Sequence, residues 1–325
     1  MRGLPYHWYR LTPLHLVLYP FSLLFRMVAA LRRLGYRWRL LPAIRIPVPV
    51  IVVGNISVGG TGKTPLTLTL VQEMTALGWH PGIISRGYGG KGGALPREVQ
   101  VDDPVEAVGD EPLLMAQRRL CPVWIGRDRP ATALALLRAH PECDVIFSDD
   151  GLQHYRLHRD VEIAVIDGTR RFGNGLLLPA GPLREPVSRL QAVDAIVVNG
   201  GTAQAGEFAM RLEGTRFQNL LNPEQIRTAS DFTGQRVHAI AGIGHPGRFF
   251  AHLQKLGLQC TPHAFPDHHA YTPSELSFAN TDALLMTEKD AVKCVAFASE
   301  RDWILRVEAQ VSPALVQLIV KKVTP

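Results

Sequence analysis

The chain of 325 residues is poor in cysteine and has no repeated or low-complexity segment. The few cysteines lie far apart, so the close pairs that indicate a metal site or a redox motif are missing. This use of cysteine favours a reducing, cytosolic environment. The absence of repeats disfavours a repeat architecture, and the length suggests two domains. The four cysteines are Cys121, Cys143, Cys260 and Cys294.

Acidic residues are absent from the first 47 positions, which hold eight arginines. These arginines more than account for the formal net charge of +6, so the rest of the chain is close to neutral. A protein that binds nucleic acid usually spreads basic residues over its folded domains. We therefore expect no nucleic-acid partner.

The N-terminal arm, residues 1–47, also lacks a long uninterrupted apolar run. Residues 11–25 are almost wholly apolar, but they fall short of the roughly 20 residues that span a bilayer, and two prolines interrupt them. Arginines follow where a secretory signal would be cleaved, which disfavours a signal peptide. We predict a membrane-associated helix at the bilayer surface, anchored by arginines and by aromatic residues, namely Tyr6, Trp8, Tyr9, Tyr19 and Trp38. A helix packed on the folded domain and a single membrane span are the alternatives.

Residues 50–65 read Val-Ile-Val-Val-Gly-Asn-Ile-Ser-Val-Gly-Gly-Thr-Gly-Lys-Thr-Pro. The apolar run predicts a strand, the glycines a loop, and residues 65–77 a helix. Glycines can direct successive N–H groups at an anion, and the helix N-terminus adds its dipole. This geometry is typical of a nucleoside triphosphate site. A glycine-rich turn that carries a surface lysine is the alternative.

Two side chains of this loop suit ATP and Mg²⁺. Lys63 would reach the β and γ phosphates, and the Thr64 hydroxyl would bind the metal. The usual pattern begins with glycine at the position of Ser57, so the loop departs from it there. The predicted nucleotide-binding residues are Ser57, Val58, Gly59, Gly60, Thr61, Gly62, Lys63 and Thr64.

Strand and helix patterns alternate from residue 48 onward. Further strands are predicted at 82–85, 123–126, 144–148, 161–167 and 195–199, with helices at 110–119 and 130–140 between some of them. Such alternation argues for a mainly parallel sheet that is covered on both faces. We assign residues 48–205 to this domain.

A small, polar stretch at 200–206 leads into an alternating strand at 208–213, and we predict a linker at 206–230. The smaller second domain, 231–325, shows the same alternation. Its predicted strands are 237–241, 258–263 and 283–286, and its predicted helices are 246–256, 273–278 and 288–298. A last strand at 303–311 is expected to pair with the linker strand.

Carboxylates stand where the predicted strands and helices place them near the phosphate loop. Asp149 and Asp150 follow an apolar strand, at the sheet edge where P-loop enzymes hold Mg²⁺. A surface Asp-Asp-Gly turn is the alternative. Asp110 begins a predicted helix, where it is either a capping residue or the base of a phosphoryl transfer.

Polar loops supply candidates for binding the acceptor. Gln153 and His154 lie just beyond the Asp-Asp-Gly turn, in a substrate loop or a solvated connection. Arg184 suits phosphate binding, and Glu185 suits a metal or the nucleotide. Residues 265–269, Phe-Pro-Asp-His-His, present two imidazoles, of which at most one is expected in the site.

The ordered motifs resemble the tetraacyldisaccharide 4′-kinases, the lipid A 4′-kinases of Gram-negative bacteria. The resemblance spans nearly the whole chain, and Ser57 follows that family's own loop. Leu152 stands where the family often has an aromatic residue. The matching segments are 53–65, Ser-Arg-Gly-Tyr at 85–88, Gly-Asp-Glu-Pro at 109–112, Asp-Asp-Gly-Leu-Gln-His at 149–154, Leu-His-Arg-Asp at 157–160, Leu-Pro-Ala-Gly-Pro-Leu-Arg-Glu-Pro at 178–186, Phe-Pro-Asp-His at 265–268 and Thr-Glu-Lys-Asp at 287–290.

This resemblance implies an α/β fold class: a P-loop NTPase-type, mainly parallel sheet domain and a smaller second α/β domain, with ATP between them. It implies transfer of the ATP γ-phosphate to the 4′-hydroxyl of an acylated glucosamine disaccharide phosphate, which gives lipid IVA. The expected location is the cytoplasmic face of the inner membrane of a Gram-negative bacterium. The site would be complete only when the two domains close on each other.

The implied site residues fall into three groups. Asp110, His268 and Lys63 are expected to be catalytic, with His268 paired to Asp110 as the base. Mg²⁺ is expected on Thr64, Asp149, Asp150 and Glu185. The lipid substrate is expected to contact Arg86, Tyr88, Arg129, Gln153, His154 and Arg184.

A second hypothesis assigns the chain to another class. A membrane-associated P-loop switch ATPase that recruits a partner protein would share the phosphate loop and the basic arm. It would leave the Phe-Pro-Asp-His segment without chemistry. Partner binding gated by ATP, with no phosphorylated lipid, would favour it.

Overall fold

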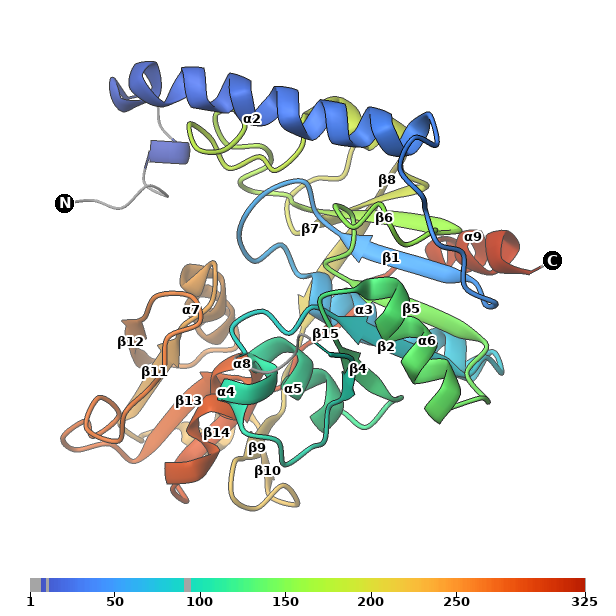
Figure 1. Cartoon of the computed structure of the whole chain (residues 1–325). Coiled ribbons are helices and arrows are strands. Elements are labelled where there is room, and N and C mark those ends of the chain that lie inside the picture. Colours follow the sequence, from blue (N-terminus) through green and yellow to red (C-terminus); the bar gives the residue numbers. More distant parts are fainter. Residues whose placement is uncertain (1–6, 10–11, 91–94, 325) are drawn as a thin grey trace.

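The structure is a computed structural model that describes residues 7–9, 12–90 and 95–324 (Figure 1). Its larger sheet has nine strands in the order β15-β8-β7-β6-β1-β5-β2-β4-β3. Only the two edge strands, β3 and β15, run antiparallel to their neighbours, which confirms the predicted mainly parallel sheet. The strands are β1 (Val50–Gly54), β2 (Pro81–Ser85), β3 (Arg97–Glu98), β4 (Val123–Ile125), β5 (Val145–Asp149), β6 (Val161–Asp167), β7 (Ala195–Asn199), β8 (Glu207–Glu213) and β15 (Glu308–Val311).

Helices cover both faces of this sheet. Along β1, Ile51 and Val53 enter one hydrophobic core, whereas Val50 and Val52 enter the other. Both faces are therefore buried, which explains why the strands read as continuous apolar runs. The first core receives α3 (Lys63–Ala76), α5 (Asp110–Gln117) and α9 (Pro313–Val323), the second receives α6 (Arg129–Ala139), and α4 (Val105–Val108) precedes α5.

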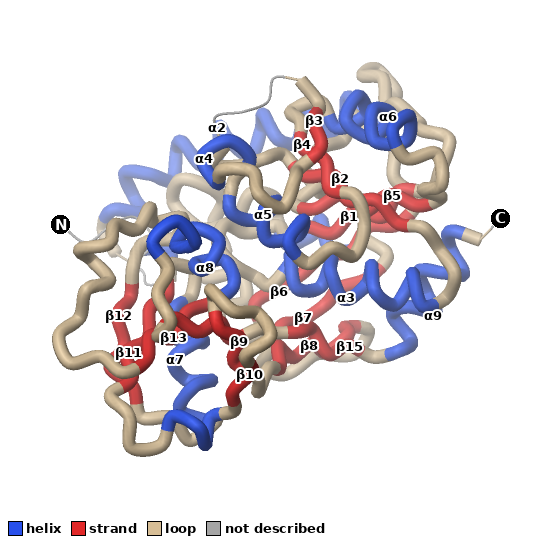
Figure 2. The backbone as a smooth tube through the Cα atoms, turned by 90° about the horizontal axis from the view of Figure 1, so that it is seen from below, coloured by secondary structure: helices blue, strands red, loops and turns tan. Residues whose placement is uncertain are grey.

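A second sheet has six strands in the order β10-β9-β14-β13-β11-β12. One helix packs on each of its faces, α7 with Phe249 and α8 with Ala291 (Figure 2). Its elements are β9 (Phe217–Asn219), β10 (Ile226–Arg227), β11 (Val237–Ala241), α7 (Pro246–Lys255), β12 (Cys260–Ala264), β13 (Ala283–Thr287), α8 (Glu288–Cys294) and β14 (Asp302–Leu305), with short 3-10 helices at Ala229–Phe232 and Val295–Phe297. A further 3-10 helix, Val187–Ala192, precedes β7 in the larger domain.

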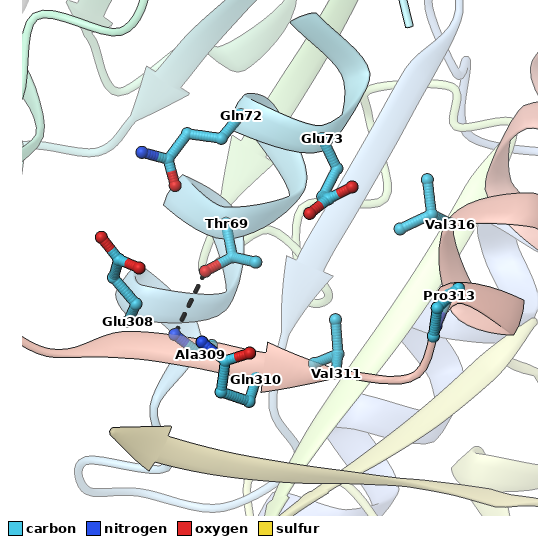
Figure 3. A pocket seen from close by; sticks show the side chains of 9 residues that line it. All are labelled: Thr69, Gln72, Glu73, Glu308, Ala309, Gln310, Val311, Pro313 and Val316. Atoms are coloured by element: carbon cyan, nitrogen blue, oxygen red, sulfur yellow. Dashed lines mark hydrogen bonds between the residues drawn. The ribbon is translucent and has the colours of Figure 1, made fainter. Parts of the chain in front are cut away.

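The chain returns to the larger sheet at its C-terminal end. The segment predicted as one strand, 303–311, is two strands: β14 lies in the second sheet, and β15 pairs antiparallel with β8. Pairing of the last strand with the linker strand is thereby confirmed. β15 also packs against α3, where the Ala309 N–H donates to Thr69 Oγ1 at 3.2 Å beside a small pocket (Figure 3). The helix α9, which the sequence did not predict, follows.

The prediction of a helix at 273–278 is wrong, because this segment forms a turn. Glu275 Oε2 accepts hydrogen bonds from both the backbone N–H and the hydroxyl of Thr272, which closes the turn. Phe278 then stacks on His263, with ring centroids 4.0 Å apart. Six residues offer too few helical hydrogen bonds to compete with these contacts.

The basic arm forms the helix α2 (Leu14–Arg37), which lies along one side of the molecule (Figure 1). It continues well past residue 25 and, by length and composition, is long and apolar enough to cross a membrane. The helix is longer than the apolar run 11–25, so its length and composition fit the single span that the sequence left open as well as the predicted helix at the bilayer surface. Of the aromatic residues named above, Tyr6 lies outside the described residues.

Ser22 makes two of the polar contacts that fix α2 to the body of the protein. Ser22 is buried, and its hydroxyl donates to Leu177 O at 2.9 Å and accepts from the Ala180 N–H at 3.0 Å. The opposite side of the helix is apolar and exposed, as at Leu16, which is 80% exposed. The helix thus both packs on the domain and presents an apolar surface outward.

Candidate active site

The loop between β1 and α3 has the backbone that its glycines predict. Gly59 and Gly62 have φ angles of 107° and 95°, in the left-handed region that favours glycine. A Cβ at Gly62 would lie 2.5 Å from Asn199 Nδ2, which itself donates to Thr61 O at 2.9 Å. The loop is therefore held from outside by the end of β7, and its last residue precedes the first turn of α3.

Lys63 and Asp150 meet at the start of α3. Lys63 Nζ lies 3.6 Å from Asp150 Oδ1, and Arg184 Nη1 donates to both Asp150 oxygens at 3.0 and 2.9 Å. Burial raises the pKa of Asp150, but the charges of Lys63 and Arg184 outweigh it and leave the pKa well below its usual range. The phosphate loop, the Asp-Asp-Gly turn and the Arg184 loop are thus brought together.

Asp149 is fully buried beside them at the end of β5. Its Oδ1 accepts from Thr67 Oγ1 at 3.4 Å, while its Oδ2 has no hydrogen-bond partner within the described residues. Burial, with the nearby negative charge of Glu111, raises the pKa of Asp149 to about 7. A buried carboxylate with a free oxygen fits a bound cation, whose charge would keep it ionised.

Of the four residues predicted to hold Mg²⁺, Glu185 is engaged with other side chains. Glu185 accepts from Gln153 Nε2 at 2.8 Å and from the Tyr155 hydroxyl at 2.5 Å, and it pairs with Arg189 at 3.3 Å. Across residues 7–9, 12–90 and 95–324, no group of three or more histidine, cysteine or acidic residues forms a metal site. Mg²⁺ in kinases is usually held by one or two protein groups together with the phosphates, so Thr64 and the neighbouring aspartates remain suitable.

Asp110 and His268 form a contact between the two sheets' domains. Asp110 is buried at the first position of α5, and His268 lies in the loop after β12 with a φ of 60°. His268 Nδ1 is 2.9 Å from Asp110 Oδ2 and 3.1 Å from Oδ1. The pairing expected from the sequence is thereby confirmed as a contact, whereas the catalytic roles stay predictions.

The protonation of this pair follows from its surroundings. Burial raises the pKa of Asp110, but the hydrogen bond with His268 and the charge of Lys289 outweigh it, so the net pKa is lowered. The hydrogen bond to Asp110 raises the pKa of His268, while burial and Lys289 oppose that rise. At neutral pH Asp110 is a carboxylate, as a general base must be.

The other predicted substrate residues surround Asp149 and the pair. Arg129 is buried and donates from Nη2 to Asp149 O at 2.6 Å, while its Nε and Nη1 have no partner within the described part of the chain. Burial, followed by the charges of Arg129 and Arg86, lowers the pKa of His154 to about 3, so His154 is neutral. Tyr88 is 67% exposed, with its ring centroid 5.3 Å from that of His268.

Comparison with known proteins identifies the family of this chain. The family model described as tetraacyldisaccharide-1-P 4′-kinase, LpxK, matches residues 14–324. A tetraacyldisaccharide 4′-kinase of Methylobacillus flagellatus is 53% identical over 323 residues, which are 99% of this chain and 96% of that protein. Another, of Azoarcus sp. (strain BH72), is 51% identical over 325 residues, 98% of this chain and 94% of that protein. This chain belongs to the tetraacyldisaccharide 4′-kinase family.

A solved family member has the same fold. The crystal structure described as the "apo" form of LpxK from Aquifex aeolicus in complex with ATP matches with a TM-score of 0.81 and 29% identity. The match covers 96% of this chain and 100% of that one. The predicted α/β fold class is thereby confirmed, and binding of ATP by a relative of this fold is established.

In the present structure, the loop between β11 and α7 lies on the phosphate loop, a contact that the sequence did not reveal. A Cβ on Gly244 would lie 2.4 Å from the Gly60 nitrogen, so the two backbones touch. Arg170 Nη1 donates to Gly244 O at 3.1 Å, and Arg248 Nη2 donates to Asp167 Oδ1 at 2.7 Å. The second domain therefore contacts the nucleotide loop through Gly244 and Asp110 through His268.

Sequence reasoning also missed Lys289 and Glu111 as site residues. Both stand in motifs that identified the 4′-kinase family, Thr-Glu-Lys-Asp and Gly-Asp-Glu-Pro, but their neighbours attracted the assignments. Lys289 Nζ donates to Glu111 Oε1 at 3.0 Å across the domain contact. A charged residue inside a matching motif was the available signal.

Proposed function

We propose that this protein transfers the γ-phosphate of ATP to the 4′-hydroxyl of a tetraacyldisaccharide 1-phosphate, giving lipid IVA. The observation that carries the proposal is the contact of buried Asp110 with His268 of the second domain, the domain whose Gly244 also touches the phosphate loop at Gly60. Glu111, next to Asp110, is near enough to Asp149 to raise its pKa, which ties the two halves of the site together. Family membership supplies the chemical class of the donor and the acceptor.

In this mechanism Asp110 takes the proton of the acceptor hydroxyl as that oxygen attacks the γ-phosphorus. His268 orients the carboxylate and stabilises the proton that it accepts. Lys63 and the loop N–H groups neutralise charge that develops on the phosphoryl oxygens. Thr64 and Asp149, with Asp150 beside them, would hold Mg²⁺, which supplies further charge stabilisation when it is bound.

Binding of the acceptor falls to the polar groups around the Asp-Asp-Gly turn. Arg129 and Arg184 supply guanidinium groups suited to a sugar phosphate, and Arg86 adds an exposed one. Tyr88, Gln153 and His154 complete the set of proposed contacts. Glu185 supports this loop through Tyr155 and Arg189, and it remains a proposed metal ligand.

In this proposal α2 holds the site at the membrane, where the acylated acceptor resides. Its exposed apolar side chains and its arginines suit the cytoplasmic face of the bacterial inner membrane. Closure of the second domain on the phosphate loop would exclude water from the transfer. These assignments rest on chemistry and family membership together.

The function is tested with purified full-length protein in detergent micelles, ATP labelled at the γ-phosphate, and tetraacyldisaccharide 1-phosphate. We expect label in a lipid product that carries a phosphate at the 4′ position. A wild-type protein that hydrolyses ATP but forms no labelled lipid would overturn the proposal. It would favour the switch ATPase, which leaves His268 without a chemical role.

Membrane attachment through α2 is a separate prediction. Deleting residues 1–40 is expected to move most of the protein into the soluble fraction, because each exposed leucine side chain contributes about 1.5–3 kcal/mol when buried in an apolar phase. Substituting glutamine for Leu16, Leu23 and Leu31 is expected to weaken attachment while keeping the Ser22 contacts. Flotation with vesicles measures both. Undiminished attachment of the deleted protein would place the docking surface elsewhere.

A further inference from the structure

One ammonium group contacts every member of the proposed base assembly. Lys289 Nζ lies 3.0 Å from Glu111 Oε1, 3.0 Å from Asp267 Oδ1, 3.4 Å from His268 Nε2 and 3.9 Å from Asp110 Oδ2. Its side chain is only 15% exposed. Two of these partners come from α5 of the larger domain and two from the loop after β12, so the lysine joins both domains at the site.

The backbone that carries Lys289 is firmly held. The Thr287 hydroxyl accepts from the Asp290 N–H at 3.2 Å and caps α8. Asp290 is fully buried and accepts from the Gly242 N–H at 3.1 Å and the Tyr271 hydroxyl at 3.0 Å. Beside the lysine, Glu288 pairs with Arg118 of the larger domain at 2.7 Å. The backbone position of Lys289 is therefore set independently of His268.

The chemistry of an ammonium group restricts what His268 can do. Lys289 Nζ carries only donors, so the neighbouring Nε2 serves it as an acceptor when the imidazole is neutral. The proton of that neutral ring must then lie on Nδ1, the nitrogen that faces Asp110. The same positive charge opposes formation of the imidazolium, because a second cation would lie next to it.

We propose that Lys289 is a positioning residue for phosphoryl transfer, which selects the Nδ1–H tautomer of His268 and keeps the Asp110–His268 pair free to accept a proton. The proposal rests on the proposed base role of Asp110. A base that already holds a proton cannot take one from the acceptor hydroxyl. Lys289 thus sets the pH above which the pair is active, and it neutralises the carboxylates that gather around the pair.

The charged groups around the lysine decide the sign of its effect. Asp110 and Glu111 face it from α5, Asp267 and His268 from the loop after β12, and α8 itself adds Glu288 and Lys293. Removing the cation leaves an excess of negative charge, which raises the pKa of both Asp110 and His268. Because two coupled groups titrate as a unit, the apparent pKa of the pair rises.

The test compares pH–rate profiles of full-length Lys289→Met and Lys289→Arg with wild type. We expect Lys289→Met to lower kcat at pH 7 by about tenfold or more and to move the acid limb of the profile upward by about one pH unit, with little change in KM for ATP. Lys289→Arg keeps the charge and is expected to restore the acid limb to within about half a unit of wild type. Lys255→Met, on the exposed end of α7, is the matched control.

Two outcomes of this comparison would overturn the proposal. A lower kcat in Lys289→Met with an unmoved acid limb would overturn the proposal and leave the lysine a structural clamp between domains. An unchanged kcat would overturn it as well. If Lys289→Met does not fold, Lys289→Gln removes the charge but keeps a donor, and the same shift is expected. Asp110→Asn in the same series distinguishes failure of the base role, since that failure leaves Asp110→Asn active.

Discussion

Replacing Asp110 by asparagine is expected to lower kcat by about 10³-fold, within the range that general base catalysis contributes. The amide has nearly the shape of the carboxylate, but it cannot take the proton of the acceptor hydroxyl. The buried position and the contact with His268 at 2.9 Å leave little room for water to substitute as the base. Initial rates at saturating ATP and lipid measure the loss.

The matched control is Asp144→Asn. The Asp144 carboxylate is exposed, lies outside the site and accepts a hydrogen bond from the His80 N–H at 2.8 Å. This control is expected to stay within about twofold of wild type. ATP binding by Asp110→Asn should persist, because its phosphate loop is unchanged. Activity of Asp110→Asn near the wild-type rate would exclude Asp110 as the base while leaving the assigned reaction intact.

Replacing Lys63 by methionine is expected to lower kcat/KM by about 10²–10³-fold, as loss of one preorganised charge at a reacting phosphoryl group does. Methionine keeps the length of the aliphatic stem, so packing at the start of α3 is retained. Asp150 loses a cation at 3.6 Å but keeps its two hydrogen bonds from Arg184. The folded structure should therefore survive, and a thermal melt checks this.

The control for this variant is Lys321→Met, near the exposed end of α9. Since Lys63 acts on both binding and transfer, we expect both a weaker affinity for ATP and a lower single-turnover rate. Loss of affinity alone, with an unchanged single-turnover rate at saturating ATP, would restrict Lys63 to nucleotide binding. Such a result would leave the N–H groups of the loop as the main stabilisers of the transferred phosphoryl group.

The sequence by itself determined the phosphate loop and the positions of most strands along the chain. Gly59 and Gly62 adopt left-handed angles because of their own lack of a side chain, which is a local property. Strands buried on both faces leave an uninterrupted apolar run in the sequence, as in β6, whose predicted and observed bounds agree. The carboxyl ends of parallel strands meet at one edge, which is why Asp150 could be placed near Lys63.

Long-range contacts were decided only by the tertiary structure. Asp110 and His268 are 158 positions apart, and only a resemblance to known proteins, not their spacing, suggested that they pair. The sequence pointed to Glu185 as a metal ligand from its residue type, yet packing engages its carboxylate with Gln153, Tyr155 and Arg189. A carboxylate can bind a metal ion or an arginine equally well, so the residue type of Glu185 alone could not show which of the two it contacts.

The N-terminal arm and Lys289 also show what local sequence predicts and what only tertiary packing decides. Apolar composition predicted a helix in the arm, but the buried contacts of Ser22 arise because the loop at residues 177–180 folds against it. In the same way, Lys289 reads in the sequence as one more charged residue at the start of a helix. It reaches Asp267 and His268 because the loop after β12 folds beside α8, and it reaches Glu111 only because the two domains pack together. Such packing depends on the shapes of the surfaces in contact rather than on any local pattern.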